Sequence, residues 1–194
     1  MKFSKIELRD LFFAWILISL AFAILLSGSD LSNISGLAIS FFVSALTVGI
    51  SFLFHELSHK FLAQRYKLWA EFRAFYNMLF FAIILSFFGF IIAAPGAVMI
   101  KGSLSKEKNG KISLAGPLTN IILALIFLPF FFIITEGVLG LIFRYGLVIN
   151  SLLAVFNLLP IPGFDGSKVY EWNPIIYALA GFVALGLFII SIIF

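Results

Sequence analysis

The sequence predicts an all-α membrane protein, a polytopic bundle of about five to six transmembrane helices with a re-entrant or β-hairpin segment near residues 74–100. Of its 194 residues, 62% are hydrophobic and only 11% are charged, whereas a soluble domain is about 45–50% apolar and about 25% charged. The apolar residues form long uncharged runs. Short clusters of Lys and Arg separate these runs, as they do at the cytosolic face of membrane proteins.

Six uncharged runs mark the expected membrane segments, since a helix needs about 20 apolar residues to cross the hydrocarbon core. In chain order they are residues 11–29, 31–54, 74–100, 112–135, 145–164 and 173–194. We expect the second helix to continue through HELSHKFLAQ, and the polar stretch 101–111 to be a loop. No small-residue cleavage site follows the first run, so we expect an uncleaved span. Together the runs predict one integral-membrane domain covering residues 1–194.

The distribution of basic residues decides how the segment 74–100 is interpreted. The basic groups lie at residues 2–9, 60–73, 101–111 and 168. If the segment enters the membrane and returns, all four groups share one side, whereas a single crossing would place the lysines of 101–111 on the opposite side, against the positive-inside rule. A Pro-Gly step in AAPGAV, residues 93–98, favours a turn. We therefore expect a re-entrant loop or short β-hairpin, with a single span as the alternative.

The pentapeptide HELSH, residues 55–59, carries the chemistry of the chain. On a helix, positions i and i+4 share one face, about 6 Å apart along the axis. His55 and His59 can therefore bind one metal ion, and Glu56 can act as general base on a water molecule, as in zinc hydrolases. These are the only two histidines in the chain, and ionisable groups at membrane depth are usually functional. The alternative is a helix end whose polar residues contact lipid headgroups.

A third protein ligand is expected, because catalytic zinc usually has three and keeps one open position. The chain contains no cysteine and no further histidine, so the third ligand must be a carboxylate. Asp165 stands out because it closes an uncharged run, and the prolines and glycines of NLLPIPGFDG, residues 157–166, break the helix and let it turn inward. The alternative is that Asp165 caps a following short helix.

The expected topology tests this ligand set. Asp165 can share the depth of His59 only if an even number of crossings separates them. The runs 112–135 and 145–164 supply two crossings, so the segment 74–100 must supply none. This is the interpretation that the basic residues also favour.

Three motifs together resemble the site-2 protease family of intramembrane zinc metalloproteases. They are HELSH, AGPLTN at residues 115–120 and NLLPIPGFDG, in this order on membrane segments. The resemblance covers a catalytic core of about residues 36–170. Many bacterial relatives carry a PDZ domain, and we expect a compact form without one, because the sequence has no room for it. Ser58 replaces a common Gly in the first motif, and Phe164 replaces the usual Leu before Asp-Gly. Neither residue is a proposed ligand.

The resemblance also implies a mechanism and a location. One zinc ion per chain would be held by His55, His59 and Asp165 within the membrane, near the cytosolic side, and Glu56 would activate water. It places Asn120 and Asn157 in the active site, where each could bind an unwound substrate backbone or the developing oxyanion. Alternatively, each amide could simply tie two helices together.

These observations predict an intramembrane zinc metalloprotease that cleaves peptide bonds in or near transmembrane segments of membrane-protein substrates, in regulated intramembrane proteolysis. We expect a multi-pass protein in the lipid bilayer, with its N-terminus and active site toward the cytosol, and no nucleic-acid partner. One rival is the protease type that cleaves prenylated tails, which would need a Glu ligand on a later helix. The other is a non-proteolytic membrane metal-binding protein or transporter.

Overall fold

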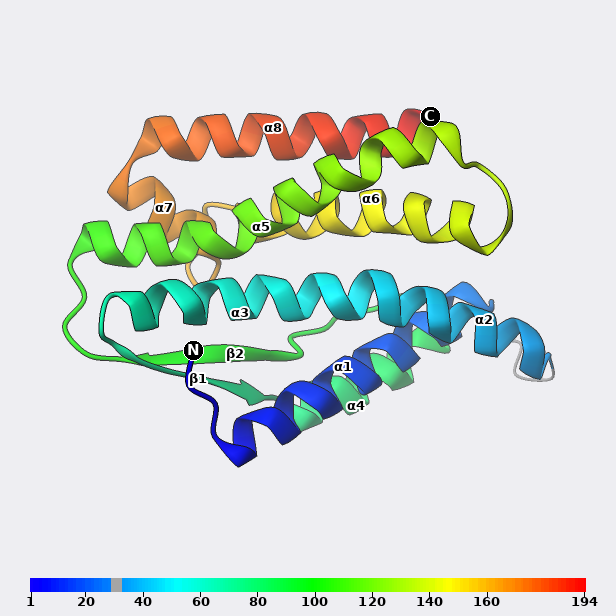
Figure 1. Cartoon of the computed structure of the whole chain (residues 1–194), viewed down its shortest axis with the longest axis horizontal. Coiled ribbons are helices and arrows are strands. Elements are labelled where there is room, and N and C mark those ends of the chain that lie inside the picture. The colour runs from blue at the N-terminus through cyan, green and yellow to red at the C-terminus, as the bar shows by residue number, and fades with distance from the viewer. Residues whose placement is uncertain (29–32) are drawn as a thin grey trace.

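The computed structural model describes residues 1–28 and 33–194. Within these residues the chain is largely helical, with one small two-stranded sheet (Figure 1). The helices are α1 Lys5–Leu26, α2 Ile34–Ser44, α3 Ile50–Arg65, α4 Tyr76–Ser86, α5 Lys106–Ile133, α6 Gly137–Asn157, α7 Asp165–Trp172 and α8 Pro174–Ile193; the π-helical turn η1 is Ala45–Gly49, and the strands are β1 Trp69–Ala74 and β2 Gly96–Lys101.

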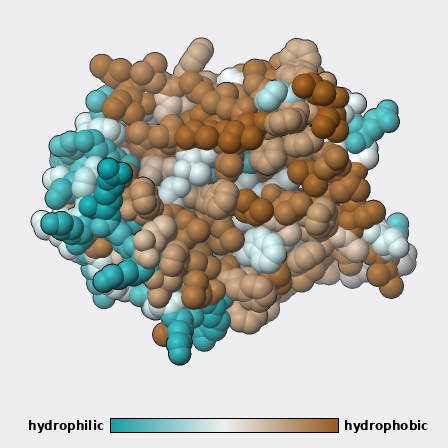
Figure 2. Space-filling model, in the orientation of Figure 1, coloured by the Kyte–Doolittle hydropathy of each residue, from teal (hydrophilic) through white to brown (hydrophobic). Residues whose placement is uncertain are grey.

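Five helical stretches of the described chain are long and apolar enough to cross a membrane. They are α1, the continuous stretch Ile34–Arg65 that joins α2, η1 and α3, and then α5, α6 and α8. Many large apolar side chains along them are exposed. Figure 2 shows hydrophobic surface over most of this face, with hydrophilic surface gathered at the end where α3 meets β1 and α5 begins. The protein is therefore an integral multi-pass membrane protein, and the predicted helical bundle is confirmed.

The segment 74–100 doubles back on itself. Strands β1 and β2 pair antiparallel, from Trp69 opposite Lys101 to Ala74 opposite Gly96, so the two ends of the segment lie side by side. Between them, α4 has only 11 residues, short of the about 20 that a crossing needs, and it packs against α1. The β-hairpin prediction is confirmed, and the single-span alternative is wrong.

A buried polar cluster ties α1 to the sheet and to α3. Glu7 and Lys60 form a fully buried ion pair between α1 and α3. Glu7 also accepts a 2.9 Å hydrogen bond from the backbone N–H of Phe72 in β1, and Asp10 accepts a 2.8 Å bond from the Tyr76 hydroxyl. We call Glu7, Asp10, Lys60 and Tyr76 the N-terminal cluster. Helix α1 thus covers the outer edge of β1, and α3 contacts both strands.

The predicted bounds of the fifth run are wrong. Helix α6 begins at Gly137, not at residue 145, because Arg144 lies within the helix instead of marking its boundary. It ends at Asn157, not at residue 164, before the two prolines of PIPG, which cannot continue a helix.

The polar stretch 101–111 is only partly a loop. Helix α5 begins at Lys106, where the Ser105 hydroxyl accepts a 3.2 Å hydrogen bond from the backbone N–H of Lys108. Such a cap satisfies one of the free N–H groups at a helix start. The predicted boundaries at Ser29 and Leu31 lie outside the described residues.

Candidate metal centre

Helix α3 brings the two histidines together. His55 and His59 are one helical turn apart, both are buried, and their Nε2 atoms are 3.0 Å from each other. Their spacing on one face is the one that the sequence predicted, and α3 continues the membrane-length stretch Ile34–Arg65 without a break. The imidazoles therefore lie inside the bundle, close to the polar end of the molecule.

Asp165 reaches the same point from the other side of the bundle. It is the first residue of α7, which follows the PIPG turn, where Gly163 has a φ of 101°. Its Oδ2 atom lies 3.1 Å from His59 Nε2 and 3.4 Å from His55 Nε2. The alternative of Asp165 as helix cap does not describe this geometry, since the N-cap position of α7 is occupied by Phe164. We call His55, His59 and Asp165 the metal cluster.

Hydrogen bonds on the far side of each ring orient the two imidazoles. His59 Nδ1 lies 2.8 Å from the carbonyl oxygen of Ile112, and His55 Nδ1 lies 2.6 Å from Asn120 Oδ1. Both partners are oxygens that accept, so each ring carries its proton on Nδ1. Each Nε2 therefore presents a lone pair to the centre of the cluster.

The metal cluster fits a zinc ion. Ligand atoms of a tetrahedral zinc with bonds of about 2.0–2.1 Å lie roughly 3.3 Å apart, and the three separations here are 3.0, 3.1 and 3.4 Å. Two neutral imidazoles and one carboxylate also match the donor set of catalytic zinc sites. Three acceptors that face one another without a donor repel, so a cation would stabilise the arrangement.

Helix α5 can approach the two imidazoles because residue 116 is glycine. A Cβ atom added there would lie 2.6 Å from His55 Nε2 and closer still to His59 Nε2. Any larger residue would thus occupy the space between α5 and the imidazoles. Gly116 is part of the AGPLTN motif, so this close approach gives that motif a structural reason.

Glu56 lies beside the cluster and contacts the sheet. It is largely buried, and its Oε2 atom accepts a 3.1 Å hydrogen bond from the backbone N–H of Val98 in β2. A cavity of about 490 Å³ opens here, and its walls include the metal cluster, Glu56, residues 93–98 and residues 163–165. The general-base candidate, the candidate metal ligands and a strand edge thus share one cavity.

The two asparagines named from the sequence occupy different places. Asn157 lines the cavity, and its Nδ2 donates a 2.9 Å bond to the Leu153 carbonyl of its own helix. Asn120 lies behind His55, fully buried, with its amide nitrogen 3.0 Å from Asn150 Oδ1. Asn150 was not predicted from the sequence, although it is another uncharged amide within an apolar run, two helical turns before Asn157.

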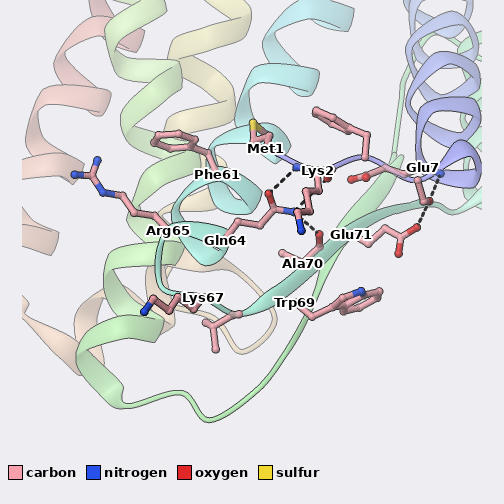
Figure 3. Close-up of a pocket in the computed structure, with 13 residues that line it drawn as sticks. Met1, Lys2, Glu7, Phe61, Gln64, Arg65, Lys67, Trp69, Ala70 and Glu71 are labelled. Atoms are coloured by element: carbon pink, nitrogen blue, oxygen red, sulfur yellow. Dashed lines mark hydrogen bonds between the residues drawn. The ribbon is translucent and has the colours of Figure 1, made fainter.

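A second, larger cavity of about 790 Å³ lies away from this chemistry. It is bounded by the N-terminal residues 1–4, the end of α3 and the start of β1 (Figure 3). The Glu71 carboxylate in the wall of this cavity accepts a hydrogen bond from the Ser4 hydroxyl and forms a salt bridge with Arg73. The Ser4 hydrogen bond, followed by the Arg73 charge, holds the pKa of Glu71 below its ordinary value despite partial burial. Its acidic groups are therefore already engaged, and the only potential metal cluster among the described residues is in the smaller cavity.

Comparison with known proteins agrees with the metal centre. The chain is 44% identical over 188 residues, covering 95% of it and 94% of the relative, to "Putative zinc metalloprotease MJ0611" of Methanocaldococcus jannaschii. It is 29% identical over 147 residues, 65% of the chain and 66% of the relative, to "Putative zinc metalloprotease YwhC" of Bacillus subtilis. No family model matches, and no solved structure gives a significant match. With its membrane-length helices, the chain belongs to this zinc metalloprotease family as a multi-pass membrane member.

Proposed function

We propose that the protein is an intramembrane zinc protease of the site-2 protease type, which hydrolyses peptide bonds in or near the transmembrane segments of membrane-protein substrates. In this proposal one zinc ion is held by His55, His59 and Asp165, and Glu56 is the general base. Regulated intramembrane proteolysis is the process that the sequence resemblance implies. The observation that carries the proposal is the convergence of His55 and His59, on the membrane-length stretch Ile34–Arg65, with Asp165 of α7. Glu56 lies in the same cavity.

The chemistry follows from the position of Glu56. A zinc ion bound by the metal cluster would supply Lewis-acid activation of a water molecule and of the scissile carbonyl. Glu56 then accepts the proton of the attacking water and delivers it to the departing amine. The Val98 N–H bond fixes the carboxylate at the cavity wall, so that it is oriented before substrate arrives.

The outer edge of β2 is the proposed docking place for an unwound substrate. Successive residues of a strand point their N–H groups to alternate sides. Since the Val98 N–H points to Glu56 and away from β1, the N–H of Ile100 points outward too, and both residues line the cavity. An extended substrate can pair with such an edge. Ile100→Pro should lower cleavage while zinc content stays, and Ile100→Ala, which keeps the N–H, should not; equal cleavage in both variants would argue against docking at this edge.

Asn157 is the better placed of the two predicted substrate-binding amides. It lies on the cavity wall with its Oδ1 free of any hydrogen bond within the described residues, whereas the amide of Asn120 is engaged by His55 and Asn150. A substrate contact by Asn120 would require breaking one of these bonds. We therefore keep Asn157 as the substrate-binding amide, because its Oδ1 can accept from a substrate N–H and the second N–H of its Nδ2 can donate to the developing oxyanion.

We propose that the N-terminus and the active site face the cytosol, because basic residues gather at the end of the molecule where the metal cluster lies. The chain has no cysteine, so single cysteines can report the orientation. The variants are Glu136→Cys and Lys106→Cys, both at exposed positions. In right-side-out vesicles, Glu136→Cys should react with a membrane-impermeant maleimide, whereas Lys106→Cys should react only after permeabilisation. The reverse pattern would contradict the proposed orientation.

Glu56→Gln separates the protease from a metal transporter. The amide keeps the shape of the side chain but cannot accept the proton of water, so purified Glu56→Gln should hold as much zinc as the wild type. Cleavage of single-span membrane proteins in proteoliposomes should fall by at least about a hundredfold, the lower end of what general bases contribute. Cleavage that survives would remove Glu56 from its role. Zinc flux into dye-loaded proteoliposomes, unchanged in the variant, would favour the transporter.

A further inference from the structure

A file of buried amides connects the metal cluster to a third helix. His55 Nδ1 on α3 is 2.6 Å from Asn120 Oδ1 on α5, and Asn120 Nδ2 is 3.0 Å from Asn150 Oδ1 on α6. Asn150 Nδ2 is in turn 2.8 Å from the carbonyl oxygen of Gly146. Asn120 and Asn150 are completely buried, so no water competes for these bonds.

The direction of the hydrogen bonds is fixed at the far end of the file. A backbone carbonyl can only accept, so Asn150 must turn its NH₂ group to Gly146 and its Oδ1 to Asn120. Asn120 must then turn its own NH₂ group to Asn150 and its Oδ1 to His55. The acceptor facing Nδ1 of His55 requires that Nδ1 carry the proton. The amide of Asn150 on α6 thus favours the orientation of Asn120 that leaves Nε2 of His55 free for a metal.

We propose that Asn150 is a positioning residue of the metal centre, which acts through Asn120 to hold His55 in the tautomer that offers Nε2 to zinc. The inference deepens the proposed function, because it rests on the metal cluster assigned there. Groups that hydrogen-bond to metal-ligating histidines fix the ring and its tautomer, and losing one typically weakens metal binding about 10–100-fold.

His55 and His59 differ in which groups fix their tautomers. His59 donates directly to the Ile112 carbonyl, a backbone group that no side-chain substitution removes. The tautomer of His55 instead depends on the Asn120 side chain, which is in turn held by Asn150. Asn120 has one other acceptor for its NH₂ group, the Ser51 carbonyl at 3.4 Å, which is longer than a good hydrogen bond. Loss of Asn150 should therefore loosen His55 without affecting His59, and its effect should lie at the lower end of the range.

A merely structural role would look different. If the Asn120–Asn150 pair only held α5 against α6, its loss would lower stability. The tautomers of His55 and His59 would then change equally or not at all. The test must therefore measure which nitrogen of each histidine ring carries the proton. The chain has only two histidines, so the ¹⁵N spectrum of histidine-labelled protein in bicelles contains just two rings, and His59→Gln assigns them.

The experiment compares wild type with Asn150→Leu, Asn150→Asp and Ser151→Ala, by histidine ¹⁵N spectra of the zinc-free protein and by zinc competition against a chelator. Asn150→Leu removes the hydrogen bonds to Asn120 and Gly146 while keeping a side chain of similar size. Asn150→Asp still accepts from Asn120, and in its protonated form still donates to Gly146, so it should rescue. Ser151→Ala removes a neighbouring buried hydroxyl that bonds only within α6, which makes it the matched control.

In Asn150→Leu we expect His55 to populate both tautomers, His59 to remain protonated on Nδ1, and zinc affinity to fall roughly tenfold. Asn150→Asp and Ser151→Ala should resemble wild type. Unchanged His55 tautomer and zinc affinity in Asn150→Leu, with zinc bound normally by wild type, would overturn this inference alone. If Asn150→Leu does not fold, loss of the His55 tautomer preference in Asn150→Asp would overturn it instead. Absence of zinc binding in wild type would overturn the metal centre and this inference together.

Discussion

Among the described residues, the N-terminal cluster and the metal cluster arrange their buried polar groups in opposite ways. In the N-terminal cluster each carboxylate has a cationic partner in the chain: Glu7 is paired with Lys60, and Asp10 is paired with Arg9 and also accepts from Tyr76. In the metal cluster three acceptors from α3 and α7 converge, with their donors used on the outer side of the rings. Burial of ionisable groups in a membrane protein therefore does not by itself identify a site. A candidate metal site is identified by a set of converging acceptor atoms to which no protein group donates a hydrogen bond.

The same helix serves both clusters. Lys60 directly follows His59 on α3 but points to α1, whereas His59 points to α5 and α7. The N-terminal cluster thus anchors α3 and β1 to α1, and the metal cluster uses the opposite face of α3. If this division is correct, substitutions in one cluster should change stability and those in the other should change zinc content.

The largest expected effect is that of Gly116→Ala. Its added methyl group would overlap both Nε2 atoms, so zinc content should fall from about one per chain to a small fraction. Gly181→Ala on α8 is the matched control, because a Cβ there has no neighbour within 4 Å. Metal analysis of both purified variants measures the effect. Full zinc content in Gly116→Ala would mean that α5 does not lie against the ligands.

Lys60→Met should have the next largest effect, on stability and not on metal. It leaves Glu7 buried without its partner, which typically costs about 3–5 kcal/mol. Denaturant unfolding in detergent should show this loss, and the double variant with Glu7→Gln should regain part of it. Folded Lys60→Met should still hold zinc. Loss of zinc at unchanged stability would contradict the separation of the two clusters.

Tyr76→Phe should have the smallest effect. It removes one hydrogen bond to a charged group, Asp10, worth about 1.5–3 kcal/mol when buried, and less here because the Arg9 guanidinium also contacts Asp10. We expect a small drop in the unfolding midpoint, with cleavage and zinc content as in wild type. A drop in cleavage would show that the anchoring of β1 also sets the position of β2 at the active site.

The convergence of His55, His59 and Asp165 could be predicted from the sequence because spacing and chain topology constrain it. The i, i+4 spacing on a helix required His55 and His59 to share a face, and counting crossings required Asp165 to return to their depth. The resemblance of three motifs pointed to the same residues. Each inference needed only periodicity and the number of spans, which an apolar sequence displays clearly.

Partners that depend on three-dimensional contact were not predictable. In the sequence Lys60 is one of the basic residues of 60–73, because nothing in its neighbourhood reveals that Glu7, 53 residues earlier, pairs with it. Asn150 looked like any polar residue in an apolar run, since its role depends on contacts between α5 and α6. The start of α6 was misplaced because an exposed arginine is tolerated within a membrane helix when its side chain reaches the interface.

Zinc content of the purified protein tests the central claim most directly, measured side by side in wild type, Asp165→Ala and Asp10→Asn. The two variants each lose one carboxylate charge, one from each cluster. We predict about one zinc ion per chain in wild type and in Asp10→Asn, and a sharply reduced amount in Asp165→Ala, because two imidazoles alone hold zinc weakly. Equal zinc in wild type and Asp165→Ala would contradict the claim that Asp165 completes the metal centre.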